Sequence, residues 1–253
     1  MIMTWYTAVF LGLVQGLAEF LPISSSGHLL LFENWFGIRE GSLLLTIILH
    51  LATLLAVVVV YHRQLWQLIR HPWNLTTVRL ILATALTCGV VLVFHNVIDS
   101  LFTVTALPYA FLVGGIYLLI PTFYHPKHAW NPWRQVVAVG LAQGVAVVPG
   151  LSRSGLTITT GRLTGMTPTN ATDFSFIMSI PIILGSLVYE LLRGGSVQSL
   201  GIGNLILAFV SAFMAGIVAI KVMLNLTKKI DLRWFAVYLL LLGSGLLLIS
   251  WFH

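Results

Sequence analysis

A carboxylate, a serine and an imidazole lie within ten residues of one another near the beginning of the chain, at Glu19, Ser25 and His28. Glu19 interrupts an apolar stretch, and an ionisable side chain in such a stretch is costly and is therefore a functional candidate by default. Ser25 and His28 are three residues apart, so they share one face of a helix. Together the three groups suit nucleophilic catalysis with proton transfer around one reacting atom. Spacing leaves open whether Ser25 or His28 is the nucleophile.

Gln15 precedes Glu19 by four residues and lies on the same helical face. Its amide suits a ligand role and equally suits packing or hydrogen bonding, so both interpretations stay open. For Glu19, the alternative to a catalytic role is a pairing with a neighbouring helix.

A first serine cluster can form the anion-binding end of a helix. Pro22 ends the first apolar stretch, and the residues that can cap the following helix are Ser24, Ser25 and Ser26. A helix that begins there presents free backbone N–H groups and a positive dipole end to an anion.

A second cluster, Ser152, Arg153 and Ser154, adds a guanidinium to the same arrangement. The fork of an arginine suits two oxygens of a phosphate. Thr157 lies three residues after Ser154 and adds a hydroxyl to that face. The alternative for Arg153 is a salt bridge to Glu19, which would not exclude phosphate binding.

The two clusters belong to an internal repeat. A shift of 128 positions aligns residues 12–29 with residues 140–157 and gives eight identities in eighteen positions without a gap. The same shift pairs Trp5 with Trp133 and Tyr61 with Tyr189. We therefore expect one membrane domain over 1–253, with repeat one at about 1–127, repeat two at about 128–253, and both clusters in one site.

Composition places the chain in a bilayer. It is 58% hydrophobic and only 8% charged, with a mean hydropathy of +0.98, whereas soluble proteins carry about a quarter charged residues. A net charge of +6 would suggest nucleic acid as a partner of a soluble protein, but here the basic residues fall mostly in short loops between apolar runs. We therefore expect no nucleic-acid partner. The single cysteine, Cys88, excludes an internal disulfide.

The apolar runs predict an all-α polytopic membrane protein with six transmembrane helices plus two re-entrant helical hairpins. A span needs roughly 20 mostly apolar residues. The expected spans are 43–61, 78–95, 104–122, 172–192, 202–226 and 232–252. Residues 3–21 and 134–148 are also apolar, but each run is soon interrupted by Pro, Gly and a serine cluster, which is tolerated at membrane depth only inside protein or beside a wet cavity.

Three spans per copy make the two copies enter the membrane in opposite orientations, an inverted-topology repeat that places a site between the copies near mid-membrane. The charges test this topology independently. One side carries eight basic residues, Arg63, Arg70, Arg79, Lys127, Arg134, Lys228, Lys229 and Arg233, and the other carries Arg39 and Arg193. The positive-inside rule makes the first side cytoplasmic and places both termini on the opposite side.

Other polar residues have simpler interpretations. We expect His50 to pack in the core and Asp173 to cap a helix. The loop histidines, His62, His71, His125 and His128, are too scattered for a metal site.

Two segments resemble the signatures of the undecaprenyl-diphosphate phosphatase family of bacterial inner membranes, the bacitracin-resistance type. They are residues 15–28, Gln-Gly-Leu-Ala-Glu-Phe-Leu-Pro-Ile-Ser-Ser-Ser-Gly-His, and residues 149–157, Pro-Gly-Leu-Ser-Arg-Ser-Gly-Leu-Thr. Their order, the chain length and the hydropathy pattern agree with that family as well. Gln15 is an allowed variant of a family position that carries Glu or Gln, and it removes the second carboxylate of a two-carboxylate metal site.

The resemblance implies an integral membrane phosphatase that converts undecaprenyl diphosphate to undecaprenyl phosphate and inorganic phosphate. This hydrolase recycles the lipid carrier for peptidoglycan and other wall polymers, and its activity confers bacitracin resistance. Its multi-pass fold would lie in the inner membrane with the site opening to the periplasm.

The resemblance also implies a set of site residues and a cofactor. The residues that match active-site positions are Glu19, Ser25, His28 and Arg153, and those in supporting positions are Gln15, Ser24, Ser26, Ser152, Ser154 and Thr157. The cofactor would be a divalent cation, Mg²⁺ or alternatively Ca²⁺, with Glu19 and Gln15 as candidate ligands. The expected partners are a polyprenyl diphosphate and the bilayer, and a homodimer stays open.

A transporter or flippase of a phosphorylated lipid or anion is the alternative function, because inverted repeats with paired broken helices also occur in transporters. It predicts movement of the substrate across vesicles without release of phosphate. The enzyme predicts phosphate release in detergent.

Overall fold

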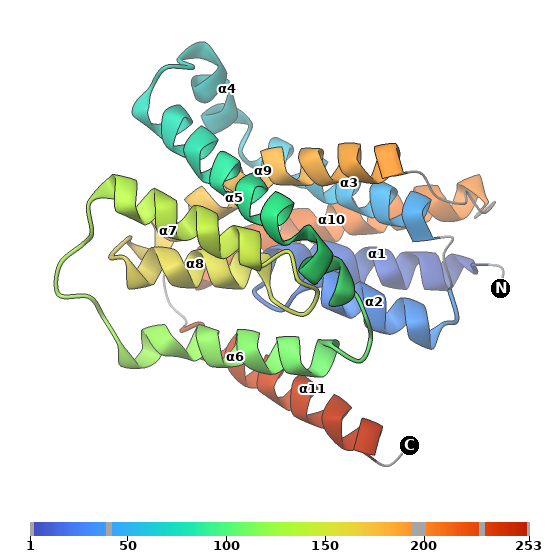
Figure 1. Cartoon of the computed structure of the whole chain (residues 1–253). Coiled ribbons are helices and arrows are strands. Elements are labelled where there is room, and N and C mark those ends of the chain that lie inside the picture. The colour runs from blue at the N-terminus through green and yellow to red at the C-terminus, as the bar shows by residue number, and fades with distance from the viewer. Residues whose placement is uncertain (1–2, 39–41, 194–200, 228–230, 252–253) are drawn as a thin grey trace.

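The structure is a computed structural model that describes residues 3–38, 42–193, 201–227 and 231–251. These residues form eleven α-helices and no strand, which confirms the all-α class (Figure 1). The helices are α1 (Trp5–Phe20), α2 (Ser25–Trp35), α3 (Ser42–Val60), α4 (His62–Arg70), α5 (Leu75–Ser100), α6 (Leu107–Phe123), α7 (Pro132–Val145), α8 (Arg153–Leu163), α9 (Pro168–Arg193), α10 (Ile202–Leu226) and α11 (Arg233–Trp251).

The long apolar helices make this a multi-pass membrane protein. Five helices in the described part of the chain are long and apolar enough to cross a bilayer, namely α3, α5, α9, α10 and α11. The sixth expected span corresponds to α6, an apolar helix of 17 residues. At about 1.5 Å per residue, α6 is about 26 Å long, near the lower limit for a span. It begins at Leu107 rather than at 104, with Pro108 in its first turn.

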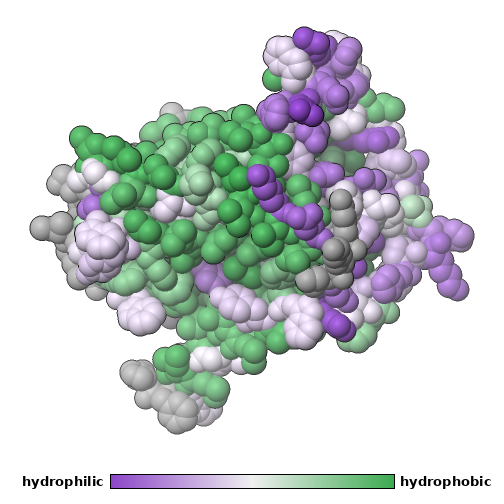
Figure 2. Space-filling view, turned by 180° about the vertical axis from the view of Figure 1, so that it is seen from behind, coloured by the Kyte–Doolittle hydropathy of each residue, from purple (hydrophilic) through white to green (hydrophobic). Residues whose placement is uncertain are grey.

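The molecular surface has an apolar part and a polar part. Figure 2 shows a broad apolar band over the middle of the molecule, with polar side chains gathered toward the end that carries α4. The α6–α7 loop lies at that end as well, whereas both termini lie at the opposite end (Figure 1). Of the basic residues behind the predicted topology, Arg39, Lys228, Lys229 and the side chain of Arg193 lie outside the described residues.

Helix α4 lies between the expected spans 43–61 and 78–95, where the sequence predicted a loop that carries His62 and His71. It has nine residues, none of them buried, and Arg70 lies over the ring of Trp66 with 4.8 Å between its Cζ and the ring centroid. A helix this short and polar gives no hydropathy signal for a span, which is why the search for apolar runs missed it.

The first helix of each broken hairpin packs along a longer helix: α1 packs along α10, and α7 packs along α5. Glycines allow both approaches. A Cβ added at Gly16 of α1 would lie 2.4 Å from the carbonyl oxygen of Ala212, and one added at Gly140 of α7 would lie 2.8 Å from that of Ala83. The shift of 128 positions carries α1 onto α7 and α5 onto α10, so the two pairings involve corresponding helices. The division into two copies and their opposite orientations in the membrane stay predictions.

Candidate active site

Both apolar stretches break where the sequence predicted, and a serine caps the helix after each break. Ser24 precedes α2 and accepts a hydrogen bond from the N–H of Gly27 at 3.3 Å, and Ser152 precedes α8 and accepts one from Gly155 at 3.0 Å. Ser24 has φ of +73°, the only positive φ of a non-glycine residue in the described segments. A serine in this unfavourable region is held there by its surroundings, a kind of strain that gathers at functional sites.

The two breaks are hydrogen-bonded to each other. The N–H of Gly150 donates to Oγ of Ser24 at 3.1 Å, and Oγ of Ser154 donates to the carbonyl oxygen of Leu21 at 3.1 Å. Gly150 has φ of +94°, which a residue with a Cβ rarely adopts. These contacts hold the two helix N-termini, and the serine clusters on them, in one place.

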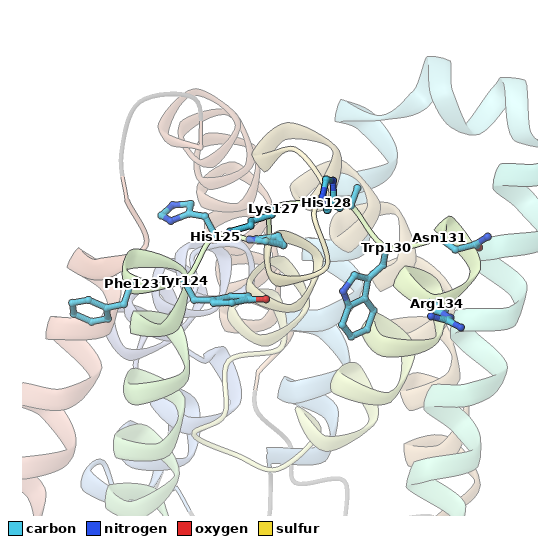
Figure 3. Close-up of a pocket in the computed structure, with 10 residues that line it drawn as sticks. Phe123, Tyr124, His125, Lys127, His128, Trp130, Asn131 and Arg134 are labelled. Carbon is cyan, nitrogen blue, oxygen red and sulfur yellow. The ribbon is translucent and has the colours of Figure 1, made fainter.

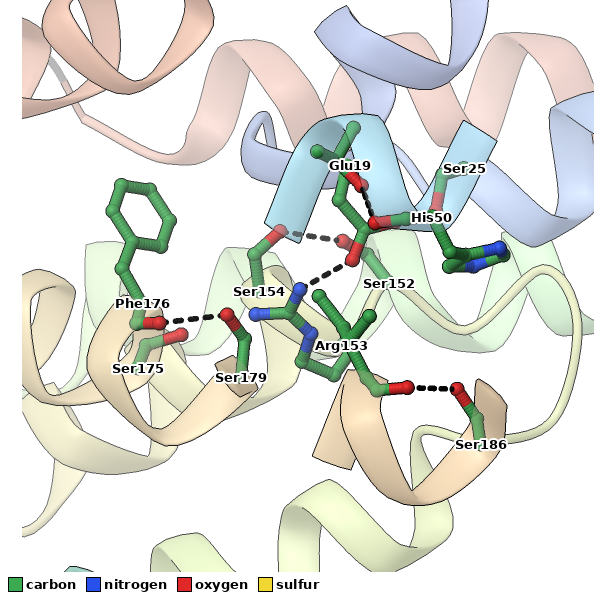
Figure 4. A network of polar contacts seen from close by, with 12 residues as sticks. Glu19, Ser25, His50, Ser152, Arg153, Ser154, Ser175, Phe176, Ser179 and Ser186 are labelled. Atoms are coloured by element: carbon green, nitrogen blue, oxygen red, sulfur yellow. Dashed lines mark hydrogen bonds and ion pairs between the residues drawn. The ribbon is translucent and has the colours of Figure 1, made fainter. Parts of the chain in front are cut away.

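Glu19 is the centre of the resulting polar network (Figure 4). Its Oε2 accepts hydrogen bonds from Oγ of Ser25 at 2.6 Å and from Nε2 of Gln15 at 3.1 Å. Its Oε1 forms a salt bridge with Nη2 of Arg153. Only 7% of the Glu19 side chain is exposed, so these partners replace the water that a carboxylate needs. The salt bridge considered as the alternative for Arg153 is therefore present.

The guanidinium of Arg153 keeps one donor free. Its Nη1 is buried and has no hydrogen-bond partner. Such an unpaired donor is costly, and it is satisfied as soon as an anion oxygen takes that position. Arg153 therefore has a donor ready for a phosphate while its other nitrogen pairs with Glu19.

A narrow pocket of about 30 Å³ lies at the junction of the breaks. It is lined by Ala18, Glu19, Ser24, Ser25, Ser26, Ala146, Leu151, Ser152, Arg153 and Ser154. This space is enough for about one water molecule. A diphosphate needs more room than this pocket offers.

His28 does not reach the Ser25–Glu19 pair in this structure. Its Nδ1 lies 2.8 Å from the carbonyl oxygen of Ser24, and its Nε2 lies 2.6 Å from the hydroxyl of Tyr238 on α11. Because a carbonyl only accepts, Nδ1 carries the proton, and in the neutral ring Nε2 accepts from Tyr238. Both ring nitrogens are thus engaged, and the three-group cluster expected from spacing is only partly assembled.

Of the remaining predicted residues, three serines line the pocket and Thr157 does not. Ser26, Ser152 and Ser154 line the pocket, and the hydroxyl oxygens of Ser152 and Ser154 are 3.3 Å apart. Thr157 is fully buried behind Arg153, where its Oγ1 lies 2.6 Å from Oγ of Ser175 on α9. Thr157 therefore joins α8 to α9 and does not line the pocket.

Sequence reasoning missed Tyr238 beside the site and gave His50 and Asp173 other roles. Tyr238 carried no signal, since a tyrosine in an apolar span is unremarkable in a sequence. His50 of α3 lies near Glu19 (Figure 4), although we expected it to pack in the core. The sequence signal for His50 was an imidazole within an apolar span. Asp173 does not cap a helix: it lies inside α9 and accepts a hydrogen bond from the hydroxyl of Tyr61 at 2.8 Å.

The side chains of the site supply some, but not all, of the oxygen ligands that a hard divalent cation needs. The described residues contain no group of three His, Cys, Asp or Glu side chains that could hold a metal ion. Oε1 of Gln15, however, is buried without a partner, one helical turn from the Glu19 carboxylate. Mg²⁺ commonly binds one or two protein oxygens and takes its other ligands from phosphate and water. Glu19 and Gln15 therefore fit a cation that arrives with a phosphate ligand.

Comparison with known proteins gives one family and a consistent set of relatives. The family described as bacitracin resistance protein BacA matches residues 8–245. The undecaprenyl-diphosphatase of Carboxydothermus hydrogenoformans is 34% identical over 256 residues, which cover 98% of each chain. Undecaprenyl-diphosphatase 1 of Shouchella clausii is 37% identical with 93% of each chain covered, and the undecaprenyl-diphosphatase of Treponema denticola is 35% identical with 98% covered.

Proposed function

The chain belongs to the family of bacitracin resistance protein BacA, and we propose that it acts as an undecaprenyl-diphosphatase. It removes the terminal phosphate of undecaprenyl diphosphate and releases undecaprenyl phosphate and inorganic phosphate. One observation carries the assignment to this site: Arg153 offers an unpaired buried Nη1 beside the hydrogen-bonded pair of Ser25 and Glu19.

In the proposed reaction, the phosphate enters the pocket and displaces Glu19 from Arg153. The guanidinium and the N-termini of α2 and α8 then hold the phosphate oxygens. Phosphoryl transfer depends mainly on such positioning and charge stabilisation.

Ser25 is the nucleophile in this proposal. Its Oγ attacks the terminal phosphorus and gives its proton to Glu19, which accepts its hydrogen bond at 2.6 Å. The bond from phosphorus to the bridging oxygen breaks, and undecaprenyl phosphate leaves. Water then attacks the phosphorus of the phosphoserine and the bond from phosphorus to Oγ of Ser25 breaks. Oγ takes its proton back from Glu19, and inorganic phosphate leaves. His28 assists proton transfer in this proposal, and the hydrogen bond from Tyr238 holds its ring in place.

A divalent cation, Mg²⁺ or Ca²⁺, would neutralise part of the phosphate charge when bound. Glu19 and the amide oxygen of Gln15 would hold it. Glu19 would then have to serve as a metal ligand in some states and as a base in others.

Location in the cell follows from the same proposal. We place the protein in the bacterial inner membrane, with the α6–α7 end cytoplasmic and the site opening to the periplasm. The basic residues at the α6–α7 end support this orientation. The product regenerates the lipid carrier for wall synthesis, and removal of the diphosphate lipid accounts for bacitracin resistance. The lack of a nucleic-acid partner stays a prediction, and a homodimer stays open.

The test is phosphate release from undecaprenyl diphosphate by the purified protein in detergent, compared with Arg153→Ala. We expect release from the wild type in the presence of Mg²⁺ and almost none from the variant. Movement of a phosphorylated lipid across vesicles without release of phosphate would contradict the proposal and would favour a transporter.

A further inference from the structure

A second pocket lies far from the catalytic residues, under the loop that joins α6 to α7. Its volume is about 810 Å³, within the range of about 300–1,000 Å³ that is typical of small-ligand sites. It is lined by Phe123, Tyr124, His125, Pro126, Lys127, His128, Ala129, Trp130, Asn131 and Arg134, and it shares no residue with the catalytic pocket. Figure 3 shows the hydroxyl end of Tyr124 directed toward Trp130 beneath the loop, and Arg134 beyond Trp130.

The loop is fixed to the rest of the protein, so the pocket is preformed. The N–H of Trp130 donates to the carbonyl oxygen of Thr164 at 2.9 Å, and Nε2 of Gln135 donates to the same oxygen at 3.0 Å. Gly165, with φ of +89°, lets the loop approach so closely that a Cβ there would lie 2.5 Å from Cα of Ala129. The turn between α8 and α9 therefore supports the loop from below.

The charge of the pocket is uncompensated. Lys127 and Arg134 line it, and the chain contains no Asp or Glu between residues 100 and 172. The one salt bridge within the described segments joins Arg153 to Glu19, so neither Lys127 nor Arg134 takes part in an ion pair there. Two cationic side chains in a pocket without a carboxylate suit an anion that carries about two negative charges. They also suit a phosphodiester whose molecule carries a further polar group beside the phosphate.

The aromatic side chains place this pocket at the membrane boundary. Tyr124 and Trp130 are half exposed, and Phe123, at the end of α6, is 83% exposed. Tyrosine and tryptophan gather at the headgroup level of a bilayer, and an exposed phenylalanine beside them provides a surface for an acyl chain. Basic pockets between helix ends on the cytoplasmic side recognise anionic lipid headgroups.

We propose that this pocket binds the headgroup of an anionic glycerophospholipid. The phosphodiester lies between Lys127 and Arg134, the glycerol part lies against Trp130 and Tyr124, and the acyl chains pass over Phe123. This binding does not depend on the proposed hydrolysis, because no residue of the pocket belongs to the catalytic site.

The test measures lipid binding to the full-length protein in detergent by native mass spectrometry, with phosphatidylglycerol against zwitterionic phosphatidylcholine. We expect preferential binding of phosphatidylglycerol to the wild type and roughly 30-fold weaker binding to Lys127→Gln/Arg134→Gln, because each basic group near an anionic headgroup contributes about fivefold. A second variant, Trp130→Ala, keeps both charges and should also weaken binding, whereas simple attraction between charges would leave it unchanged.

The matched control is Arg63→Gln/Arg70→Gln, which removes two arginines of α4 at the same end of the molecule but outside the pocket. We expect this double variant to bind phosphatidylglycerol like the wild type. An equal loss in both double variants would overturn the proposal, since it would show general charge attraction. Binding of inorganic phosphate to the wild type without preference for phosphatidylglycerol over phosphatidylcholine would also overturn it, in favour of a free phosphate.

Discussion

The hydroxyl of Tyr238 lies 2.6 Å from Nε2 of His28, although 210 positions separate the two residues in the chain. Their rings are stacked, with 5.7 Å between centroids and 12° between planes. The bond from Nδ1 to the Ser24 carbonyl fixes which nitrogen carries the proton, so Tyr238 must donate. Tyr238 of α11 thereby sets the orientation of the His28 imidazole. His28 lies three residues after Ser25, the proposed nucleophile.

We predict that Tyr238→Phe lowers kcat/KM for undecaprenyl diphosphate about fivefold. The substitution removes one hydrogen bond, worth about 1 kcal/mol, while the ring that stacks on His28 remains. Steady-state phosphate release as a function of pH is the measurement, and the profile should shift only if His28 takes part in proton transfer. In a His28→Ala background, the same change at Tyr238 should have no further effect. Independent, additive losses would show that Tyr238 does not act through His28.

Ser25→Ala should reduce phosphate release by about a thousandfold or more, because it removes the attacking oxygen. Ser26→Ala is the matched control from the same cluster, and its effect should be about tenfold or less, since Ser26 only lines the pocket. A phosphoenzyme trapped by acid quench should map to Ser25. Near-normal turnover by Ser25→Ala, or a phosphate mapped to His28, would transfer the nucleophilic role to the imidazole.

Arg153→Ala should both inactivate and destabilise the protein. Removal of the guanidinium leaves the Glu19 carboxylate buried without its charge partner, which costs about 3 kcal/mol. The double variant Glu19→Gln/Arg153→Ala should regain most of the thermal stability in detergent, because no buried charge is left, and it should remain inactive. A double variant as unstable as Arg153→Ala would show that Arg153 stabilises the fold by packing rather than by pairing with Glu19.

The positions of the helix breaks could be predicted because local rules determine them. Pro22 cannot continue the hydrogen bonding of α1, and Ser24 and Ser152 are favourable N-cap residues in front of glycine-containing first turns. The repeat then indicated that the two caps belong together. The salt bridge between Glu19 and Arg153 was foreseen as an alternative because an unpaired charge is too costly at that depth.

The rest of the site depends on contacts between distant helices, which spacing alone does not reveal. Nothing local to His28 indicates that Tyr238 approaches it. The expected role of Asp173 was wrong because α9 begins five residues earlier than that residue, at Pro168, and places the carboxylate next to Tyr61. His50 was assigned to the core by the usual behaviour of a lone histidine, and only the packing of α3 beside α1 brings it near Glu19.

Gly16→Ala should destabilise the protein by about 2 kcal/mol through the contact of α1 with α10. The new methyl group would lie 2.4 Å from the carbonyl oxygen of Ala212, so the helices must separate. Gly89→Ala is the matched control in α5, where a Cβ meets no atom within 4 Å and a helical alanine is preferred over glycine. Thermal unfolding in detergent should show a lower midpoint for the first variant and an equal or higher one for the second. Equal midpoints for both would contradict the close packing.

Gln15→Glu should lower the Mg²⁺ concentration needed for half-maximal phosphate release by about tenfold. The unpaired Oε1 of Gln15 lies on the same face as Glu19, so a second carboxylate there increases the negative charge offered to a hard cation. Gln15→Leu should have the opposite effect, because it removes that oxygen and leaves the shape of the helix intact. The measurement is a Mg²⁺ titration of activity after chelation, with Gln143→Leu as the control at the corresponding position of α7, where the amide donates to Thr87 and not to a carboxylate. If Gln15→Glu, Gln15→Leu and the wild type share one Mg²⁺ dependence, Gln15 is not a ligand, and its amide serves only to orient Glu19.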